Sequence, residues 1–550
     1  MSNTSVNKIE DDVFLNKNVL VVCAETQAWP MHYVAEKLRP LCKSVSAIFI
    51  QPGEAYFNFP DYSLFKELNK DMQIHEMSKV VVEYLDKQRY ADKHIDRKYI
   101  EHIENRYTNF SILNEQFLAE MTMLPYYHDR NYYKFVDYDR ILLYTQIYYQ
   151  YIENLFATIK PDLILDCDID FFGRSVLLEV SRAHGVPYIS IDHARIDGYV
   201  LPTDALCKRV NLNVRKTYQK ILNDSALEQD KNLIKFADQV QETIGGIPKI
   251  FEKEYKHSKF STYKLTKELI SINLMFIRTF SLKKFVLNRL KGISTPICGD
   301  TIEALKFFYF YYFRRLYLRL FKTFSQIDLK KIHYIYVPLH VIPESTTTIL
   351  SPIYINEAFI IEALSKSVKS GQFIVIKEHW SMLGYRKISF YKKIRRLPNV
   401  ILIDPEQDHP PKYYIENADL IVTISGSSAL EGAMIGKNSL VFSDVTFGLL
   451  SSVKKISVDP TLKETIQQHM KYVMPQREKL AYCKLITALG EKVNTKKLML
   501  PPHNVNKLDI EVNVQGLLNV YRKGLANLYT ANPGTDEVAT NSILKRKIGA

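Results

Sequence analysis

Short apolar runs alternate with segments of helical periodicity throughout the second half of this chain. The runs predict strands at Tyr334–Val337, Gln372–Lys377, Val400–Ile403, Leu420–Ile424 and Ser439–Phe442. Helical spacing fits the segments between them, at Ile355–Val368, Ile388–Arg396, Tyr413–Asn417 and Ser428–Ile435. Regular alternation of this kind is typical of a doubly wound α/β domain with a parallel sheet. The pattern therefore predicts such a domain from Ile332 onward.

The first part of the chain shows the same order of elements twice. A Val-rich run at Asn18–Cys23 is followed by helical spacing at His32–Leu41 and by an apolar run at Val45–Ile50. The order returns with the run at Pro161–Cys167, a helical stretch from about 174 to 184, and the run at Val186–Ile191. A second α/β domain is therefore predicted ahead of the first.

These elements define a predicted domain organisation. We expect an N-terminal Rossmann-like domain at 1–223 with a helical insertion at 56–160, a helical connector at 224–330, a second Rossmann-like domain at 331–500, a C-terminal helix at 501–529 that crosses back to the first domain, and a disordered tail at 530–550.

Composition narrows the class of protein. The 550 residues suit two or three domains, and a formal charge of +13 favours anionic partners such as nucleotides, phosphorylated carriers or acidic lipid. No recognisable nucleic-acid-binding module is present, so nucleic acid is not expected as a partner. The six cysteines form no CxxC pair, which is typical of reduced thiols in a cytoplasmic protein and argues against zinc. Neither a signal peptide nor a membrane-spanning helix is expected.

A basic and aromatic segment, 283–322, precedes the second domain. It holds nine Lys and Arg residues against two acidic ones, and the run FFYFYYF lies among them. Such a segment can lie on an anionic membrane surface, which would place the protein peripherally on the inner face of the cell membrane. It can equally be a connecting helix whose aromatic side chains pack in the core.

Three segments of the second domain directly follow strands, where a doubly wound sheet binds its ligands. They are Lys377–Glu378–His379, Ser425–Gly426–Ser427–Ser428, and Pro338–Thr348. The small residues after Ile424 let the backbone approach a ligand, and the helix that follows offers unpaired N–H groups to a phosphate. The hydroxyls of Ser427 and Ser428 can donate to phosphate oxygens, or one of them can simply cap the helix.

Three charged or titratable residues are further candidates for nucleotide binding. His379 and Lys377 lie on one face if the strand continues, and the imidazole can hydrogen-bond a phosphate leaving group or serve a structural role. Glu431, in the first helical turn, can help to cap the helix or accept hydrogen bonds from a ribose.

The ordered combination of these pieces resembles a known family. From about Tyr334 to Phe447 the chain shows YVPLHVIPESTT with a following SP, then IKEHW, FYKKIRRLPNVILID, ADLIVTISGSSALEGAMIGK and LVFSD. This stretch is similar to the nucleotide-binding half of bacterial capsule and surface-polysaccharide glycosyltransferases. The resemblance implies the GT-B arrangement, in which two Rossmann-type domains face a cleft. Trp380 and Asn438 depart from the pattern, because the family has proline at both positions.

The His and hydroxyl-turn pairing is also similar to that of Kdo transferases and bacterial sialyltransferases, which use CMP-activated sugars. By that resemblance His379, Ser427 and Ser428 would hold phosphate, and Glu431 would hold the ribose or base side. It implies a CMP-sugar as the first choice of donor and a UDP-sugar as the second, with no other cofactor and no metal.

The catalytic base is expected from the first domain, on a loop that follows a strand. The candidates are Glu25, Asp168, Asp170 and His193. The acidic run that begins at Asp166 resembles a DxD metal motif, but acidic residues commonly end buried strands. Arg174 and Arg195 are possible contacts for an acidic sugar or acceptor.

We therefore expect a metal-independent glycosyltransferase that moves a sugar from a nucleotide-sugar to a surface polysaccharide or glycolipid. Two enzyme alternatives with similar folds are a nucleotide-sugar epimerase and a polyol-phosphate transferase. A third alternative is a non-catalytic scaffold in glycan assembly, which would not bind nucleotide.

Overall fold

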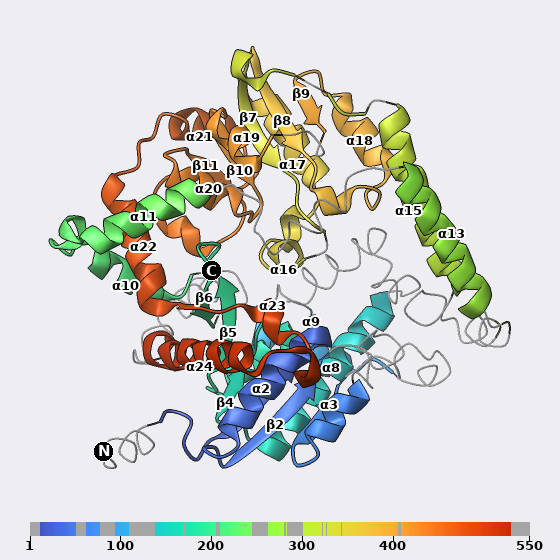
Figure 1. Cartoon of the computed structure of the whole chain (residues 1–550), viewed down its shortest axis with the longest axis vertical. Helices are drawn as coiled ribbons and strands as arrows, with labels where there is room; N and C mark the ends of the chain where they lie inside the picture. The colour runs from blue at the N-terminus through green and yellow to red at the C-terminus, as the bar shows by residue number, and fades with distance from the viewer. Residues whose placement is uncertain are drawn as a thin grey trace.

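A computed structural model gives the structure of the chain (Figure 1). It describes residues 12–50, 62–77, 94–108, 138–168, 172–204, 210–244, 262–279, 282, 286, 301–321, 323–325, 327–342, 344–404 and 409–529. The predicted tail at 530–550 lies outside these residues, as do large parts of the predicted insertion at 56–160 and of the basic segment.

The first sheet has seven strands in the order β13-β6-β5-β4-β1-β2-β3. Strands β1 to β5 run parallel to one another, whereas β6 is antiparallel to both of its neighbours, β5 and β13. The strands are β1 (Asn18–Cys23), β2 (Ser44–Phe49), β3 (Gln73–Glu76), β4 (Leu163–Leu165), β5 (Tyr188–His193), β6 (Tyr199–Thr203) and β13 (Glu491–Lys492).

The second sheet has six strands, all parallel, in the order β12-β11-β10-β7-β8-β9. They are β7 (His333–Pro338), β8 (Gln372–Lys377), β9 (Val400–Ile403), β10 (Leu420–Thr423), β11 (Ser439–Val441) and β12 (Val453–Lys455). The first five coincide with the predicted strands to within a residue at each end. The predicted fold class, α/β with two Rossmann-type domains, is confirmed.

Helices cover both faces of the first sheet, because apolar residues of its central strand β1 point to each face in turn. Val19 and Val21 of β1 pack with α2 (Ala28–Leu38), α3 (Tyr62–Leu68) and α24 (Lys507–Leu528). Leu20 and Val22 face the other way, against α6 (Arg97–Ile103), α8 (Tyr138–Ile159) and α9 (Phe172–Ala183).

The second sheet is covered in the same way. On one face lie α17 (Glu357–Ser367), α18 (Ile388–Arg395) and α21 (Leu462–His469). On the other lie α19 (Pro411–Glu416) and α20 (Ser428–Met434). Outside this layer α10 (Leu212–Leu222) and α11 (Lys231–Thr243) pack with α22 (Gln476–Leu489), so one apolar core joins the two halves of the molecule.

Four strands differ from the sequence expectations. β3 lies at the sheet edge within the range expected to be a helical insertion, and β13 joins the first sheet although it lies in the range assigned to the second domain. β6 and β12 were not expected at all. All four are short, and none has the uninterrupted Val and Ile run that identifies a central strand from sequence. Only pairing with a neighbour makes them strands.

Candidate functional site

The site lies where the strand order of the second sheet reverses. From β7 the chain continues to β8 and β9 on one side, and then returns to β10, β11 and β12 on the other. In open α/β sheets a crevice forms at such a reversal, beyond the carboxyl ends of the strands. His340 follows β7 and the turn Ser425–Ser428 follows β10, so the reversal brings these two segments together.

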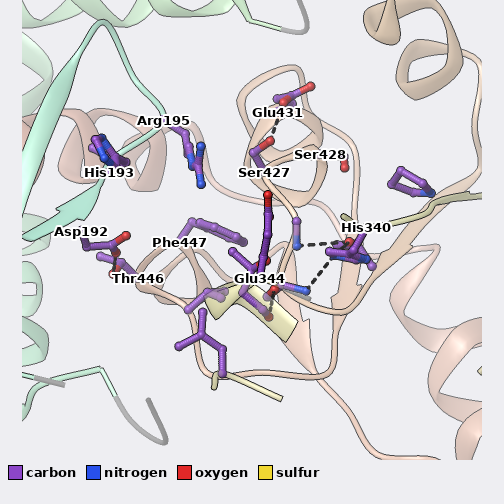
Figure 2. A pocket seen from close by; sticks show the side chains of 18 of the residues that line it. Asp192, His193, Arg195, His340, Glu344, Ser427, Ser428, Glu431, Thr446 and Phe447 are labelled. Carbon is purple, nitrogen blue, oxygen red and sulfur yellow. Dashed lines mark hydrogen bonds between the residues drawn. The ribbon is translucent and has the colours of Figure 1, made fainter. Parts of the chain in front are cut away.

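A cavity of about 650 Å³ opens there, between the two sheets (Figure 2). This volume suits a ligand of nucleotide size. From the second domain it is lined by Lys377, His379, Trp380, Ser425, Gly426, Ser427, Ser428 and Glu431, and also by His340, Glu344 and Thr446. From the first domain it is lined by Asp192, His193 and Arg195, which lie at and just after the carboxyl end of β5.

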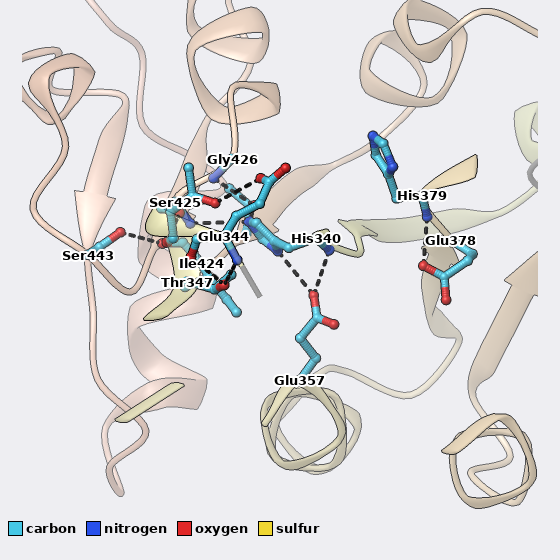
Figure 3. A network of polar contacts seen from close by, with 12 residues as sticks. His340, Glu344, Thr347, Glu357, Glu378, His379, Ile424, Ser425, Gly426 and Ser443 are labelled. Atoms are coloured by element: carbon cyan, nitrogen blue, oxygen red, sulfur yellow. Dashed lines mark hydrogen bonds and ion pairs between the residues drawn. The ribbon is translucent and has the colours of Figure 1, made fainter. Parts of the chain in front are cut away.

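His340 is held rigidly beneath the turn at Ser425 (Figure 3). Its Nδ1 lies 3.1 Å from Glu357 Oε1, which also accepts a hydrogen bond from the His340 N–H. Its Nε2 lies 3.0 Å from Thr423 Oγ1 and 3.4 Å from the Ser425 N–H. Since the carboxylate can only accept, Nδ1 carries the proton, and Nε2 accepts from the turn.

Beneath His340, one arginine joins two buried carboxylates. The Arg386 side chain lies 2.6 Å from Glu357 Oε2 and 2.7 Å from Glu378 Oε2. Arg386 also donates to the His340 carbonyl oxygen, and Tyr391 donates to Glu378. Burial raises the pKa of Glu357, but Arg386 and the hydrogen bonds from His340 outweigh burial and lower it overall. The pKa of Glu378 stays raised, since burial exceeds the effect of Arg386. This network of ion pairs and hydrogen bonds holds the backbone and ring of His340 in place below the turn.

Replacing Gly426 with alanine tests how tightly the turn is packed. A Cβ there would lie 2.6 Å from Thr423 Oγ1 and 3.2 Å from His340 Nε2, so the turn or the Thr423–His340 contact must shift. We expect a loss of about 1–3 kcal/mol in the free energy of unfolding, measured by urea denaturation. Gly448→Ala is the control, because its added methyl would meet only Val445 Cγ2, at 3.9 Å. Equal stability of the two variants would contradict tight packing.

The four residues of the turn have different surroundings. The Ser425 hydroxyl donates to the Thr346 carbonyl oxygen, and the Gly426 N–H donates to Thr423 Oγ1. Ser427 does not cap α20 with its side chain, but donates to Glu431 Oε1 at 2.9 Å. The Ser428 hydroxyl makes no hydrogen bond to any other residue that the structure describes, and Ser428 lines the cavity. Only Ser428 therefore presents a hydroxyl that the protein itself does not use.

His379 is a neutral donor at physiological pH. Burial, followed by the positive charges around it, lowers the pKa of His379 to about 4. Its Nδ1 accepts from the Ser381 N–H at 3.3 Å and lies 2.6 Å from Ser381 Oγ, so the proton of the neutral ring sits on Nε2. The Trp380 ring lies 5.3 Å from the His379 ring, centroid to centroid. Burial also lowers the pKa of Lys377 to about 8, and its Nζ lies 4.1 Å above the Tyr414 ring.

Titratable groups from both domains face each other across the cavity (Figure 2). Burial raises the pKa values of Glu344 and Glu431, and the positive charge of Arg195 partly offsets both shifts. Asp192, whose pKa burial also raises, accepts a hydrogen bond from Thr446 Oγ1 at 3.1 Å. Burial and then Arg195 lower the pKa of His193. His193 is therefore neutral near pH 7 and able to accept a proton.

The other first-domain candidates fall at a second strand reversal, between β1 and β4. Gln27 donates to the Asp168 carboxylate, whose charge acts on both His193 and Glu344. Asp168 is not among the residues that line the cavity. Asp170 and the side chain of Glu25 lie outside the described part of the structure.

Arg174 was expected as a possible ligand contact, and the structure corrects this. Its guanidinium is completely buried and pairs with Asp166 at 2.8 Å. Asp166 also accepts from Tyr188, so neither residue reaches the cavity, and the first residue of the DxD-like pattern is a buried ion-pair partner directly after a strand. Asn438, where the family has proline, donates to the carbonyl oxygens of His469 and Tyr472 and likewise plays a structural role.

Several residues of the site were not singled out from the sequence. His340 and Glu344 lie in the segment Pro338–Thr348, which was recognised by its position after a strand and by its motif resemblance, without a role for either residue. Asp192 and Thr446, which connect the two domains, had no sequence signal. Among the described residues, no group of three or more His, Cys, Asp or Glu side chains is placed to hold a metal ion.

No protein-family model matches the sequence, and no curated protein matches it. Solved structures do match, at low similarity. The KpsC β-Kdo 2,7 transferase of Thermosulfurimonas dismutans is 12% identical over 68% of this chain and 90% of that one, with a TM-score of 0.28. The UDP-GlcNAc 2-epimerase of Methanocaldococcus jannaschii, in complex with UDP-GlcNAc and UDP, is 9% identical over 86% and 99% (TM-score 0.27). A glycosyltransferase of Rickettsia africae is 11% identical over 94% and 100% (TM-score 0.24). At TM-scores this low, the activities of those proteins do not extend to this chain.

Proposed function

We propose that the chain is a glycosyltransferase that binds a nucleotide-sugar in the cavity between its two sheets. The observation that carries the proposal is the composition of the cavity wall. The second domain supplies Lys377, the Nε2–H of His379 and the Ser428 hydroxyl at one strand reversal. Across from them, the first domain supplies His193 and Arg195, as a transfer between donor and acceptor requires.

Each group has a role in the proposal. Lys377, His379 and Ser428 bind the phosphate of the donor, and they stabilise the charge of the leaving nucleotide without a metal ion. Glu431, positioned by Ser427, accepts hydrogen bonds from the ribose. The motif resemblance favours a CMP-sugar over a UDP-sugar. Arg195 adds a cation on the acceptor side, which suits an acidic sugar.

His193 is the general base of the proposal. It is neutral at pH 7 and lines the cavity on the first-domain side. Asp168 is placed to act through its charge on His193. We further propose that the acceptor is a capsular or surface polysaccharide, or its lipid-linked precursor, and that the reaction takes place in a bacterial cytoplasm.

A nucleotide-sugar epimerase is the second candidate. It is favoured by the three carboxyl groups of raised pKa, Glu344, Glu431 and Asp192, which share the cavity with His193. Such a set could remove and return a proton on one sugar without any acceptor. Incubation with donor alone separates the two reactions: an epimerase converts the sugar while the nucleotide stays attached, and a transferase does not.

Nucleotide binding is the direct test. We expect CMP, at one hundred times its dissociation constant, to stabilise the folded protein by about 2.7 kcal/mol, visible as a rise in melting temperature. His379→Ala and Ser428→Ala should each weaken binding about tenfold or more, because each removes a hydrogen bond to a charged group.

The matched controls are His333→Ala, whose side chain is 83% exposed at the start of β7, and Ser457→Ala, also exposed. Both should bind nucleotide as the unmodified protein does. A preference for UDP would change the donor and keep the reaction class. A folded protein that responds to no nucleotide would contradict the proposal and favour the scaffold alternative.

A further inference from the structure

We propose that the helical arm formed by α13 (Thr262–Thr279) and α15 (Thr301–Leu320) is a docking surface for a bilayer with anionic headgroups. The arm lies along the outer side of the second domain, away from the shared core (Figure 1). This proposal goes beyond the reaction proposed above and does not depend on it.

The outer face of α15 is apolar. Its inner face packs on the second domain through the buried Leu318 and through Tyr311, whose ring contacts Tyr385. At a spacing of three and four residues the opposite stripe exposes 41–67% of each side chain, in Tyr309, Phe310, Phe313, Leu316 and Leu320. Neighbouring large apolar side chains exposed to this extent on one helix mark an interaction surface.

The outer face of α13 continues this surface. Tyr263, Ile270, Leu274 and Ile277 share one face by their spacing, and each exposes 49–77% of its side chain. The hydroxyl of Tyr309 donates to Asn273 Oδ1 at 2.9 Å. Asn273 is half-buried and borders the apolar stripe of α13, and Tyr309 belongs to that of α15, so this bond joins the two helices beside their stripes.

The positive charge of the arm indicates an anionic partner. Residues 262–322 hold twelve Lys and Arg residues against three Asp and Glu. Lys267, Lys306 and Arg319 are exposed on the two helices, and Lys392 of α18 lies 5.3 Å from the ring of Tyr317. Apolar side chains flanked by cations are the combination that binds an anionic membrane surface, through insertion at the acyl boundary and attraction to the headgroups.

The base of the arm is fixed to the donor-binding domain. A Cβ at Gly384 would lie 2.8 Å from the Tyr311 carbonyl oxygen, so only glycine allows the backbone of α15 to come this close. Arg314 donates to the Tyr385 carbonyl oxygen at 2.7 Å, and the Tyr311 and Tyr385 rings are in contact. Docking of the arm would therefore hold the cavity at a set orientation to the membrane, where a lipid-linked acceptor is found.

Within the described ranges, no helix combines the length and the hydropathy that crossing a bilayer requires.

Vesicle co-sedimentation tests the proposal, with purified full-length protein and no nucleotide. We expect binding to vesicles that contain phosphatidylglycerol to be at least about tenfold tighter than to pure phosphatidylcholine, and to weaken at high salt. The triple variant Phe310→Ser/Phe313→Ser/Leu320→Ser should lose at least about tenfold in partitioning.

The matched control is Val473→Ser/Leu508→Ser/Val512→Ser, which removes side chains that are 84%, 67% and 58% exposed elsewhere on the surface. It should bind vesicles like the unmodified protein, and unchanged melting temperatures would show that both triple variants fold. Equal loss in both triple variants, or equal binding to neutral vesicles, would overturn the proposal. So would a dimer in sedimentation velocity that only the arm variant dissociates, because the surface would then belong to a second copy. None of these outcomes bears on nucleotide binding, which is measured separately.

Discussion

Arg386→Met is expected to destabilise the second domain by about 3–5 kcal/mol, because it leaves two buried carboxylates without their counter-ion. Arg386 contacts Glu357 at 2.6 Å and Glu378 at 2.7 Å, and all three side chains are at most 4% exposed. The loss can be followed by urea denaturation through the fluorescence of Trp380, one of only two tryptophans, in a Trp29→Phe background.

The pH dependence of this loss has a definite sign. In the unmodified protein the pKa of Glu357 is lowered, so its contribution to stability is present at neutral pH and is lost as the pH falls through its folded-state pKa. Without Arg386 both carboxyl groups should titrate above their unfolded pKa, which favours folding as they protonate. The difference in stability between variant and unmodified protein should therefore narrow from pH 7 to pH 5.

Two further variants make the Arg386 result interpretable. Arg395→Met removes an exposed arginine of α18 and should change stability by no more than about 0.5 kcal/mol. Adding Glu357→Gln and Glu378→Gln to Arg386→Met should recover part of the loss, since no unpaired charge then remains. A loss below about 1 kcal/mol in Arg386→Met would show that water reaches the pair.

His193→Ala is expected to lower kcat by about 10²- to 10⁴-fold, the usual contribution of a general base, with little change in the KM for the donor. The readout is release of nucleotide from CMP-sugars in the presence of a glycan acceptor. In the unmodified protein, the acidic limb of the kcat/KM profile should lie below the ordinary histidine pKa of about 6.5, because burial and Arg195 lower the pKa of His193.

Asp168→Asn distinguishes between Asp168 and His193 as the general base. The charge of Asp168 raises the pKa of His193, so its removal should move the acidic limb to lower pH while turnover is largely retained. His333→Ala is the control and should leave the profile unchanged. A larger fall in kcat for Asp168→Asn than for His193→Ala would identify Asp168 as the base instead.

The second domain was predictable from local sequence. Central strands of a parallel sheet are buried on both faces, so they must be continuous apolar runs, and helices must lie between them. Lys377, His379 and Ser425–Ser428 follow such runs directly, and the parallel order alone places them at one edge of the sheet. The positions of these residues in the cavity wall therefore follow from the positions of the strands. Their roles as nucleotide ligands remain a prediction.

Contacts between distant segments could not be predicted in this way. Arg174 and Arg195 are both arginines near the ends of apolar runs, yet one is buried against Asp166 and the other lines the cavity. His340 acquires its tautomer from Glu357, 17 residues further along, and from Thr423, 83 residues away. Nothing in the local sequence of either segment records such a partner.

The sequence by itself determined the central strands of the two α/β sheets and the segments that follow them, because burial on both faces dictates an apolar run wherever a central strand lies. Only the tertiary structure decided which polar groups face the cavity and which are neutralised in the interior. It also decided that α13 and α15 leave apolar stripes exposed. Burial and charge pairing depend on residues that lie far apart in the chain, and these meet only once the sheets have formed.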